Sequence, residues 1–331
     1  SIQSLLFVII GNSILEIRGM WFEFWLIMFS TACFSNLLGL IISSTFNSAK
    51  VIYIVIPLII IPQLLFSGVI VKFHKLHPSL STATEVPWIG NLMVSRWSYE
   101  ALVVEQATQN ELERNFLELE ISKSNAEWKK DYWTQEIKQQ IRNLDSDNKA
   151  IRIEAADILK REIQLEEEYW SNFKCGDCFW EKDNDTKFDE HKIQTFLNKA
   201  KAQYNSFIAR DNKAMDAKID EIGKEKYLEW ERENVNNTLM MVVSNKLETE
   251  KLIIDKDQIY RNDKPIFNLP KNVSFMESHF YAPYKYIFGH KVTTHQANIL
   301  VIWLMSILVY ALLYFDFFKL LLVRLLRILN K

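Results

Sequence analysis

The sequence has few of the residues on which small exported domains and nucleotide-binding enzymes depend. It contains three cysteines, too few for a disulfide framework, and eight glycines, none of them in the G-x-x-x-x-G-K-[ST] pattern that cradles phosphates. No nucleophile–base pair or metal-ligand cluster accompanies its apolar segments, so we expect no catalytic residue and no metal. The net charge of −2 gives no reason to expect a nucleic-acid partner.

What the chain does have is a very uneven distribution of charge. Of its 80 charged side chains, 10 fall in residues 1–107 and 5 in residues 292–331, which leaves 65 for residues 108–291. This pattern of two apolar ends and one polar middle excludes a single soluble domain. The chain also opens at Ser1 inside an apolar run, and we interpret it as part of a longer polypeptide.

Three segments are long and apolar enough to cross about 30 Å of hydrocarbon. Val51–Val71 carries no charge, and Trp21–Ser44 carries only Glu23 near one end. Val292–Phe315 is the third, while Ser1–Leu15 is shorter and is interpreted as the end of a further span. Because a central charge costs about 2.5–3.5 kcal/mol on insertion scales, the lack of charge favours membrane spans over buried core helices.

The cations set the expected orientation. Asp316–Lys331 carries four cations against one acid, which by the positive-inside rule places this tail in the cytoplasm. Counting back through the spans makes residues 72–291 periplasmic or extracellular. We therefore expect an integral membrane protein, of the bacterial inner membrane, whose polar middle is exported.

Two prolines interrupt the span Val51–Val71. Pro57 and Pro62 each lack an N–H and crowd the carbonyl four residues back, on Tyr53 and Leu58. In lipid those carbonyls need partners or a watery lining. The segment either lines a pathway or bends in a way that neighbouring helices absorb, and the prolines alone do not decide between these.

A family resemblance rests on residues around this span. Residues 56–71 resemble the fifth membrane helix of ABC-2 type, G-subfamily-like transporters, most specifically in the ending Phe66-Ser67-Gly68-Val69-Ile70-Val71. Residues 86–90 (Val-Pro-Trp-Ile-Gly) and 92–102 resemble the re-entrant helices of that family's external loop. The segments 7–15 and 29–43 are similar to its third and fourth helices, and the last span is similar to its sixth.

The resemblance implies an all-α membrane fold, the C-terminal part of a six-helix ABC-2 type domain. It implies an ATP-driven exporter whose nucleotide-binding domain, with ATP and Mg²⁺, precedes this part of the chain, and two copies that pair as a homodimer around a pathway. An aliphatic valve would fall on Val69 and Ile70, with Gly68 letting the copies approach closely. Pathway-facing positions would fall near Ile61, Leu64 and Leu65.

Arg96 and Glu100 stand four residues apart on one face of the second re-entrant segment. One interpretation is a polar relay that holds this helix near the outer edge of the membrane. The other is an ordinary exposed ion pair, worth about 0.5 kcal/mol. We favour a structural role.

Residues 108–282 depart from the family and read as an exported insert. Apolar residues recur every seven positions in one charged segment, which predicts a long coiled-coil-like helix. A second helix over Ile193–Ile222 would pair with it as an antiparallel hairpin. Leu252–Ile259 and Pro265–Leu269 suggest two strands around a turn at residues 261–264. The heptad positions of the first helix are Ile137, Leu144, Ile151, Ile158 and Leu165.

The link between the two predicted helices contains Cys175-Gly176-Asp177-Cys178. A C-x-x-C pair suggests a thioredoxin-like site, a zinc site or a local disulfide. Without a βαβ context and in an exported segment, we favour the disulfide. His74 and His77 could form a metal pair, but no carboxylate or cysteine accompanies them, and we interpret them as interfacial.

The sequence thus predicts four parts: membrane helices over 1–71, re-entrant helices over 72–107, the insert over 108–282, and the last span with its basic tail over 283–331. We expect the permease portion of an ABC exporter in contact with lipid, moving an amphipathic substrate. The insert would bind an exported protein partner. The alternative is a membrane-anchored scaffold or sensor whose exported helices bind a partner without transport.

Overall fold

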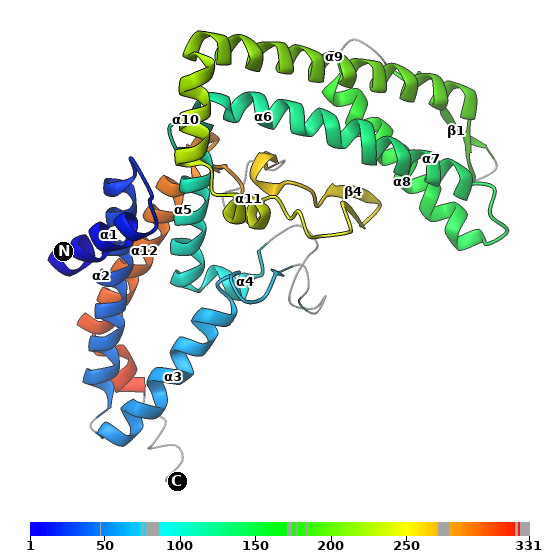
Figure 1. The fold of residues 1–331 in the computed structure, drawn as a ribbon. Helices are drawn as coiled ribbons and strands as arrows, with labels where there is room; N and C mark the ends of the chain where they lie inside the picture. Colours follow the sequence, from blue (N-terminus) through cyan, green and yellow to red (C-terminus); the bar gives the residue numbers. More distant parts are fainter. Residues whose placement is uncertain are drawn as a thin grey trace. The chain divides into compact units, whose positions relative to one another are not determined.

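The computed structural model describes residues 1–46, 48–73, 76, 86–170, 174–176, 178–182, 185–270, 278–321 and 324. His74, His77, Arg327 and Lys331 lie outside the described residues. The chain divides into two compact units (Figure 1). Residues 1–114, 229–243 and 269–331 form what we call the membrane unit, and residues 115–228 and 244–268 form the insert unit.

The membrane unit is built from helices and one hairpin. Two helices of the described chain, α2 and α12, are long and apolar enough to span a membrane, and α1 and α3 are apolar but shorter. Only 28% and 22% of the apolar windows in α2 and α12 are buried, so these helices are not covered as the core of a soluble protein would be. Its complete elements are α1 (Ile2–Ile14), α2 (Trp21–Thr45), α3 (Ala49–Leu65), α4 (Trp88–Asn91), α5 (Val94–Thr108), α11 (Asn237–Val243), β5 (Tyr284–Ile287), β6 (His290–Thr293) and α12 (Thr294–Tyr314).

The helix α3 ends earlier than the apolar run predicts. The sequence places its end at Val71, but the last helical residue is Leu65. Ser67 Oγ donates to the carbonyl of Leu64 and accepts from the Val69 amide, and Gly68 takes a left-handed φ of +84°. A hydroxyl that satisfies the last carbonyls, followed by a left-handed glycine, stops a helix whatever the hydropathy beyond it.

The last span also begins two residues later than predicted. Val292 and Thr293 belong to the strand β6, which pairs with β5 in a hairpin that the sequence did not suggest. Thr293 then caps α12, its hydroxyl accepting from the Gln296 amide at 3.3 Å. The span therefore starts directly at the end of a strand.

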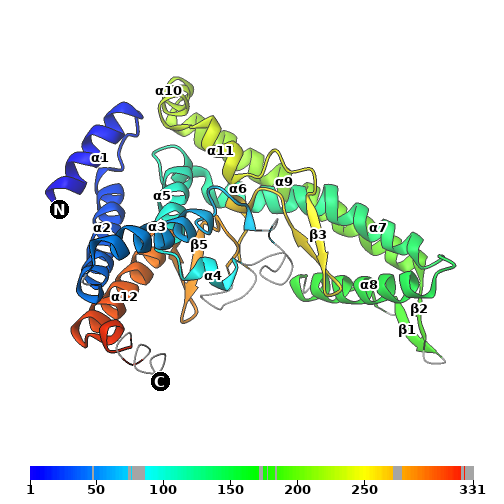
Figure 2. The same ribbon diagram turned by 90° about the horizontal axis from the view of Figure 1, so that it is seen from below.

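The helix α5 is the centre of the membrane unit. It packs against both α12 and α2, and Figures 1 and 2 show α2 and α12 running beside each other. Side chains at helical spacing on α5, among them Val94, Trp97, Ala101 and Val104, are almost completely buried. Phe34 of α2 and Ile302 of α12 close the cluster around Val94 and Trp97.

The insert unit is mainly helical, with two short hairpins. The heptad pattern predicted one helix through Leu144 and Ile151, but the helix ends at Asn143 and a new one begins at Lys149. The Asn148 side chain caps this second helix by accepting from the Ala150 amide at 2.9 Å. The elements of this unit are α6 (Glu113–Trp128, its first two residues in the membrane unit), η2 (Lys129–Trp133), α7 (Thr134–Asn143), α8 (Lys149–Tyr169), β1 (Phe179–Lys182), β2 (Asp185–Phe188), α9 (Glu190–Ile222), β3 (Leu252–Asp255), β4 (Gln258–Arg261) and η3 (Pro265–Phe267), with α10 (Lys224–Asn234) shared between the units.

The break changes how the apolar stripe is used. Ile137 and Ile158 are buried, but Ile151 and Leu165 are 40% and 37% exposed, so the heptad does not form one continuous seam. Instead Trp133, Ile137, Ile158 and Leu197 share one core supplied by η2, α7, α8 and α9. The predicted two-helix hairpin is therefore a packed group of shorter helices around α9.

The β element has a different register from the predicted one. The turn lies at Lys256 and Asp257, so that β3 and the first half of β4 fall inside the first predicted strand, and Pro265 opens the short helix η3. Both turn residues are left-handed, with φ of +48° and +60°, as a two-residue type I′ turn requires. The sequence prediction placed the turn five residues too late.

Candidate functional site

A cluster of buried charges lies where α5, the β5–β6 hairpin and α12 meet. Its centre is Glu100, which is fully buried. Lys285 Nζ donates to Glu100 Oε2 at 2.6 Å and Asn298 Nδ2 donates to the same oxygen at 2.9 Å. The amide of Tyr281 donates to the other carboxylate oxygen at 3.3 Å. The carboxylate on α5 is therefore held by a stretch of chain, residues 281–298, that lies more than 180 residues further along the sequence.

Asn298 connects the cluster to the last span. Its amide nitrogen also donates to the carbonyl of Trp97 at 2.9 Å, and its oxygen accepts from Lys285 Nζ at 2.8 Å. All of its side-chain groups are thus used between α5 and β5. A polar residue in a spanning helix commonly marks a functional contact, and here it fixes α12 to α5.

Arg96 occupies the same cluster with fewer hydrogen bonds. Its Nη2 lies 3.6 Å from Glu100 Oε2, and its guanidinium carbon lies 3.9 Å from the centre of the Trp97 ring. Its Nε and Nη1 are buried and have no hydrogen-bond partner among the described residues. The pair is 1% and 0% exposed, so the interpretation as an exposed ion pair is wrong.

The charges keep the central carboxylate ionised. Burial alone would raise the pKa of Glu100, but the positive charges of Arg96 and Lys285 and the hydrogen bonds from Lys285 and Asn298 outweigh it, and the pKa lies below its usual range. Burial lowers the pKa of Lys285, and the attraction of Glu100 offsets only part of that effect. The cluster is a buried ion network in which each charge depends on the others.

Packed aromatic rings connect this cluster with the loop that follows α3. Phe280 packs edge-on against Phe73, with ring centres 4.9 Å apart, and lies 6.3 Å from the ring of Tyr99. The Arg96 guanidinium lies 5.8 Å from the centre of the same ring. A Cβ atom added to Gly68 would stand only 2.5 Å from Phe280 Cζ. Within the chain, Gly68 is therefore in close contact with Phe280. The approach of two copies at this glycine stays a prediction.

The predicted valve residues lie on this loop, beyond the helix. Val69 and Ile70 are 57% and 62% exposed. The predicted pathway residues Ile61, Leu64 and Leu65, on the last turns of α3, are also exposed. The structure thus leaves the predicted valve residues and the predicted pathway residues exposed in the described part of the chain. The loop that carries Val69 and Ile70, which we call the valve loop, packs against Phe280 through Gly68.

The end of α3 is tied to the start of α5. Ser95 donates through its hydroxyl to both the backbone and the side-chain oxygen of Gln63, and its amide donates to the latter at 3.2 Å. Pro57 and Pro62 both lie inside α3, as the sequence predicts. A change in the direction of α3 would therefore reach α5 through Gln63.

Cys175 and Cys178 lie elsewhere, in the insert unit. They are joined by a disulfide, with the Cα atoms 5.5 Å apart, and Cys178 belongs to the core of that unit. Among the described residues no group of three His, Cys, Asp or Glu side chains is placed to hold a metal ion. The disulfide closes the loop before β1 and takes no part in the charge cluster.

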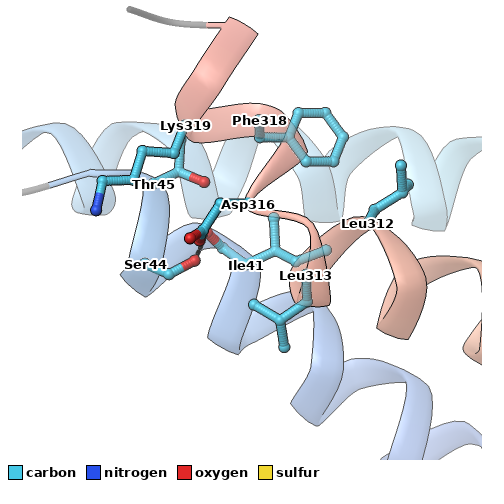
Figure 3. A pocket seen from close by; sticks show the side chains of 8 residues that line it. All are labelled: Ile41, Ser44, Thr45, Leu312, Leu313, Asp316, Phe318 and Lys319. Carbon is cyan, nitrogen blue, oxygen red and sulfur yellow. Dashed lines mark hydrogen bonds between the residues drawn. The ribbon is translucent and has the colours of Figure 1, made fainter.

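A small hollow at the other end of the spans is lined by both α2 and α12. Figure 3 shows Ser44 and Thr45 of α2 facing Leu313, Asp316 and Lys319. Asp316 has a left-handed φ of +48° and the chain becomes helical again directly after it. The hollow marks the bend that ends α12.

Sequence reasoning found Arg96 and Glu100 but missed Lys285, Asn298 and Phe280. Lys285 lies in a segment assigned to the junction with the last span, and nothing local distinguishes it from an exposed lysine. Asn298 did carry a signal, because an amide inside an apolar span must find partners in protein or water. Phe280 could be recognised only by its contact with Gly68.

The family comparison agrees with the membrane part of this architecture. Residues 1–106 match the family model described as ABC-2 type transporter. Searches of curated proteins and of solved structures give no match to the chain. The match covers α1 to α4 and most of α5, including Arg96, Glu100 and the loop after α3. Residues 1–106 are therefore similar to the membrane domain of ABC-2 type transporters, which supports an ABC-2 permease family for this membrane protein.

Proposed function

We propose that the chain is the permease portion of an ATP-driven exporter of the G-subfamily type, and that two copies enclose a pathway for an amphipathic substrate. The observation that carries this proposal is the match of residues 1–106 to the ABC-2 type transporter model. ATP and Mg²⁺ would bind a nucleotide-binding domain elsewhere on the polypeptide. The chain's own part is to form and seal the pathway.

The surface of α3 supports a pathway that needs a second copy. No residue of α3 is buried by the described part of the chain, and the helix carries both prolines. An apolar constriction blocks hydrated solutes by excluding water, but it requires side chains on more than one side. Val69 and Ile70 of one copy, facing those of the other, would supply such a seal.

The charge cluster supports a coupling role for α5. It joins α5 to α12 through Asn298, while Gln63 joins α5 to α3. A movement of the membrane helices would thus be transmitted to the loop that carries the valve residues. The insert, residues 108–282, would lie in the periplasm of a bacterial cell and bind an exported protein partner through its helices.

Cysteine cross-linking in membranes tests the paired valve. In the full-length polypeptide with Cys33 replaced by alanine, Val69→Cys and Ile70→Cys should each cross-link to the second copy on mild oxidation. Trapping with ATP and vanadate should change the yield, because closure of the nucleotide-binding domains would move the valve. Tyr310→Cys, at a 56% exposed site on α12, is the matched control and should not cross-link.

Each outcome separates the alternatives. A cross-link at residues 69 and 70 that responds to vanadate supports the exporter. A cross-link that does not respond indicates a paired scaffold or sensor without transport. Absence of any cross-link at both positions would overturn the paired pathway.

A further inference from the structure

Two hairpins in the described chain have the same construction and different chemistry at the tip. In both β3–β4 and β5–β6, four residues pair with four across a two-residue turn. Lys256 and Asp257 form the first turn, with φ of +48° and +60°, and Phe288 and Gly289 form the second, with φ of +49° and +81°. A type I′ turn favours Asn, Asp or Gly at its first central position, so both Lys256 and Phe288 depart from this preference, and Phe288 is the apolar one of the two.

Phe288 makes no contribution to the core of its own unit. Its side chain is 98% exposed, more than any other large apolar side chain in the described residues. A bulky residue in a left-handed conformation costs free energy, and no burial within the chain offsets it. Such a residue indicates a contact outside the chain.

The β5–β6 hairpin is attached to the start of the last span. The amide of Thr294 donates to the carbonyl of Pro283 at 3.2 Å, and Lys285 reaches Asn298 in the second turn of α12. Figure 2 shows β5 beside this end of α12, with which both strands are in contact. Four strand residues extend about 13 Å, so Phe288 lies within about 13 Å of the residue at which α12 begins.

Aromatic side chains mark the same level on α2. His295, at the start of α12, lies with its Nε2 3.2 Å from the carbonyl oxygen of Glu23 in the first turn of α2. Trp21 and Phe22 in that turn are 42% and 62% exposed. Exposed aromatic residues at the ends of spans are typical of the boundary between lipid and water.

The rest of the hairpin suits that boundary. His290 and Lys291 on β6 are exposed, and the Lys291 ammonium lies 3.8 Å from the centre of the Tyr284 ring. Cationic side chains beside aromatic rings suit the phosphate level of the headgroups, while Phe288 suits the acyl chains just beneath it. The β3–β4 tip, with a lysine and an aspartate, has no such character.

We infer that the β5–β6 hairpin is a lipid anchor, which inserts Phe288 into the lipid–water interface at the end of the bilayer where α12 begins. The occupant of this surface is the phospholipid itself. The inference requires α12 to cross the membrane but does not require transport, so it can hold even where the exporter proposal fails.

Fluorescence quenching at two matched turn positions tests the anchor. In the full-length protein with Cys33→Ala, Cys175 and Cys178 remain joined by their disulfide, and one added thiol carries the polarity-sensitive dye NBD. This thiol is introduced as Phe288→Cys or as Lys256→Cys, and the protein is reconstituted in phosphatidylcholine vesicles. The two sites take the same position in turns of the same length, and they differ in location and in the residue beside them. Phe288 is fully exposed, so its substitution leaves the core intact.

The anchor predicts a blue-shifted emission at 288. It also predicts several-fold stronger quenching there than at 256 by a phospholipid bearing a nitroxide near the headgroup. Iodide in the water should quench the dye at 256 more than at 288. Equal iodide quenching at both sites would overturn the inference, because the tip would then lie in water. Protection of 288 from both quenchers would also overturn it, because a second copy or another part of the protein would then cover the tip.

Discussion

Two buried glutamates, Glu100 in the membrane unit and Glu166 in the insert unit, have their charges balanced in different ways. In the insert unit, Glu166 accepts from Lys129 Nζ at 2.6 Å, from Trp170 Nε1 at 2.8 Å and from the Tyr204 hydroxyl. Lys129 remains 16% exposed, so the one cation in that set stays close to water. The charges balance one to one, and neutral donors fill the remaining positions.

In the membrane unit two cations, both at most 1% exposed, face the single carboxylate of Glu100. Taking a charge out of water is costly, and only a close opposite charge compensates for it. Arg96 and Lys285 therefore share one compensating group, whereas Lys129 has its own. The difference indicates that the hydrogen bonds around Glu166 serve the packing of the insert unit. In the network on α5, Glu100 is the one described residue that balances the charges of Arg96 and Lys285.

The largest expected effect follows from removing the shared charge. Glu100→Gln should lower the free energy of unfolding by about 3–5 kcal/mol, because Arg96 and Lys285 would remain buried without a counter-charge. The thermal unfolding midpoint of the purified full-length protein measures the loss. Hydrogen exchange should rise in α5 and at the start of α12 and stay unchanged in α8 and α9.

The matched substitution in the other unit sharpens the comparison. Glu166→Gln should cost about 1–3 kcal/mol, since the amide oxygen still accepts and Lys129 can turn toward water.

Adding Lys285→Met to Glu100→Gln should restore part of the stability lost in the membrane unit, because one buried cation is removed. Equal losses for the two glutamates would contradict the distinction between the units.

A second contrast concerns two glycines with left-handed backbones. Gly68→Ala should cost about 2–4 kcal/mol, from the left-handed conformation and from overlap with Phe280. Gly223, after α9 in the insert unit, has a φ of +91° and nothing within 4 Å of an added Cβ. Gly223→Ala should therefore cost the backbone part alone, about 1–2 kcal/mol.

The shift in unfolding midpoint of each alanine variant measures these costs. A double variant, Gly68→Ala with Phe280→Leu, should be less destabilised than the sum of its parts, because the smaller side chain makes room for the methyl group. If Gly68→Ala and Gly223→Ala behave alike, the packing of Phe280 on the valve loop has no energetic importance.

The spans were the most predictable part of the fold. Trp21–Ser44 was expected and α2 runs from Trp21 to Thr45. Charge and length decide such segments, because each charge in hydrocarbon carries a large penalty that no later packing removes. The end of α3 was missed because Ser67 and Gly68 stop the helix through local hydrogen bonds and backbone conformation, which hydropathy does not report.

The candidate site could be predicted only in part. The spacing of Arg96 and Glu100 identified one helix face, but the principal partner Lys285 is 185 residues away from Glu100 in the sequence. Glu100 precedes the insert and Lys285 follows it, so whether the two pair depends on the fold of the whole chain between them. The heptad of the insert was likewise broken by Asn148, a helix cap whose effect outweighs an apolar periodicity that continues on both sides.

The smallest expected effect concerns a carboxyl group further along α5. Burial, and to a lesser extent the nearby charge of Glu23, raise the pKa of Glu105 to about 7. Its pKa in the unfolded chain is lower, so the folded protein binds an extra proton in the window between about 4.3 and 7. Folding is therefore favoured at the acidic side of this window and loses stability as the pH rises through it.

Glu105→Gln imitates the protonated group and should flatten this dependence. The variant should gain about 1–2 kcal/mol over the native protein at pH 8 and almost nothing at pH 5, as measured by unfolding midpoints at the two pH values. Glu231→Gln, at an exposed site on α10, is the control and should shift the midpoint equally at both. A gain in stability that is the same at pH 5 and pH 8 would contradict this prediction, because Glu105 would then be ionised at both. The helix α5 would in that case carry two buried negative charges, and only the charge of Glu100 has cations to balance it.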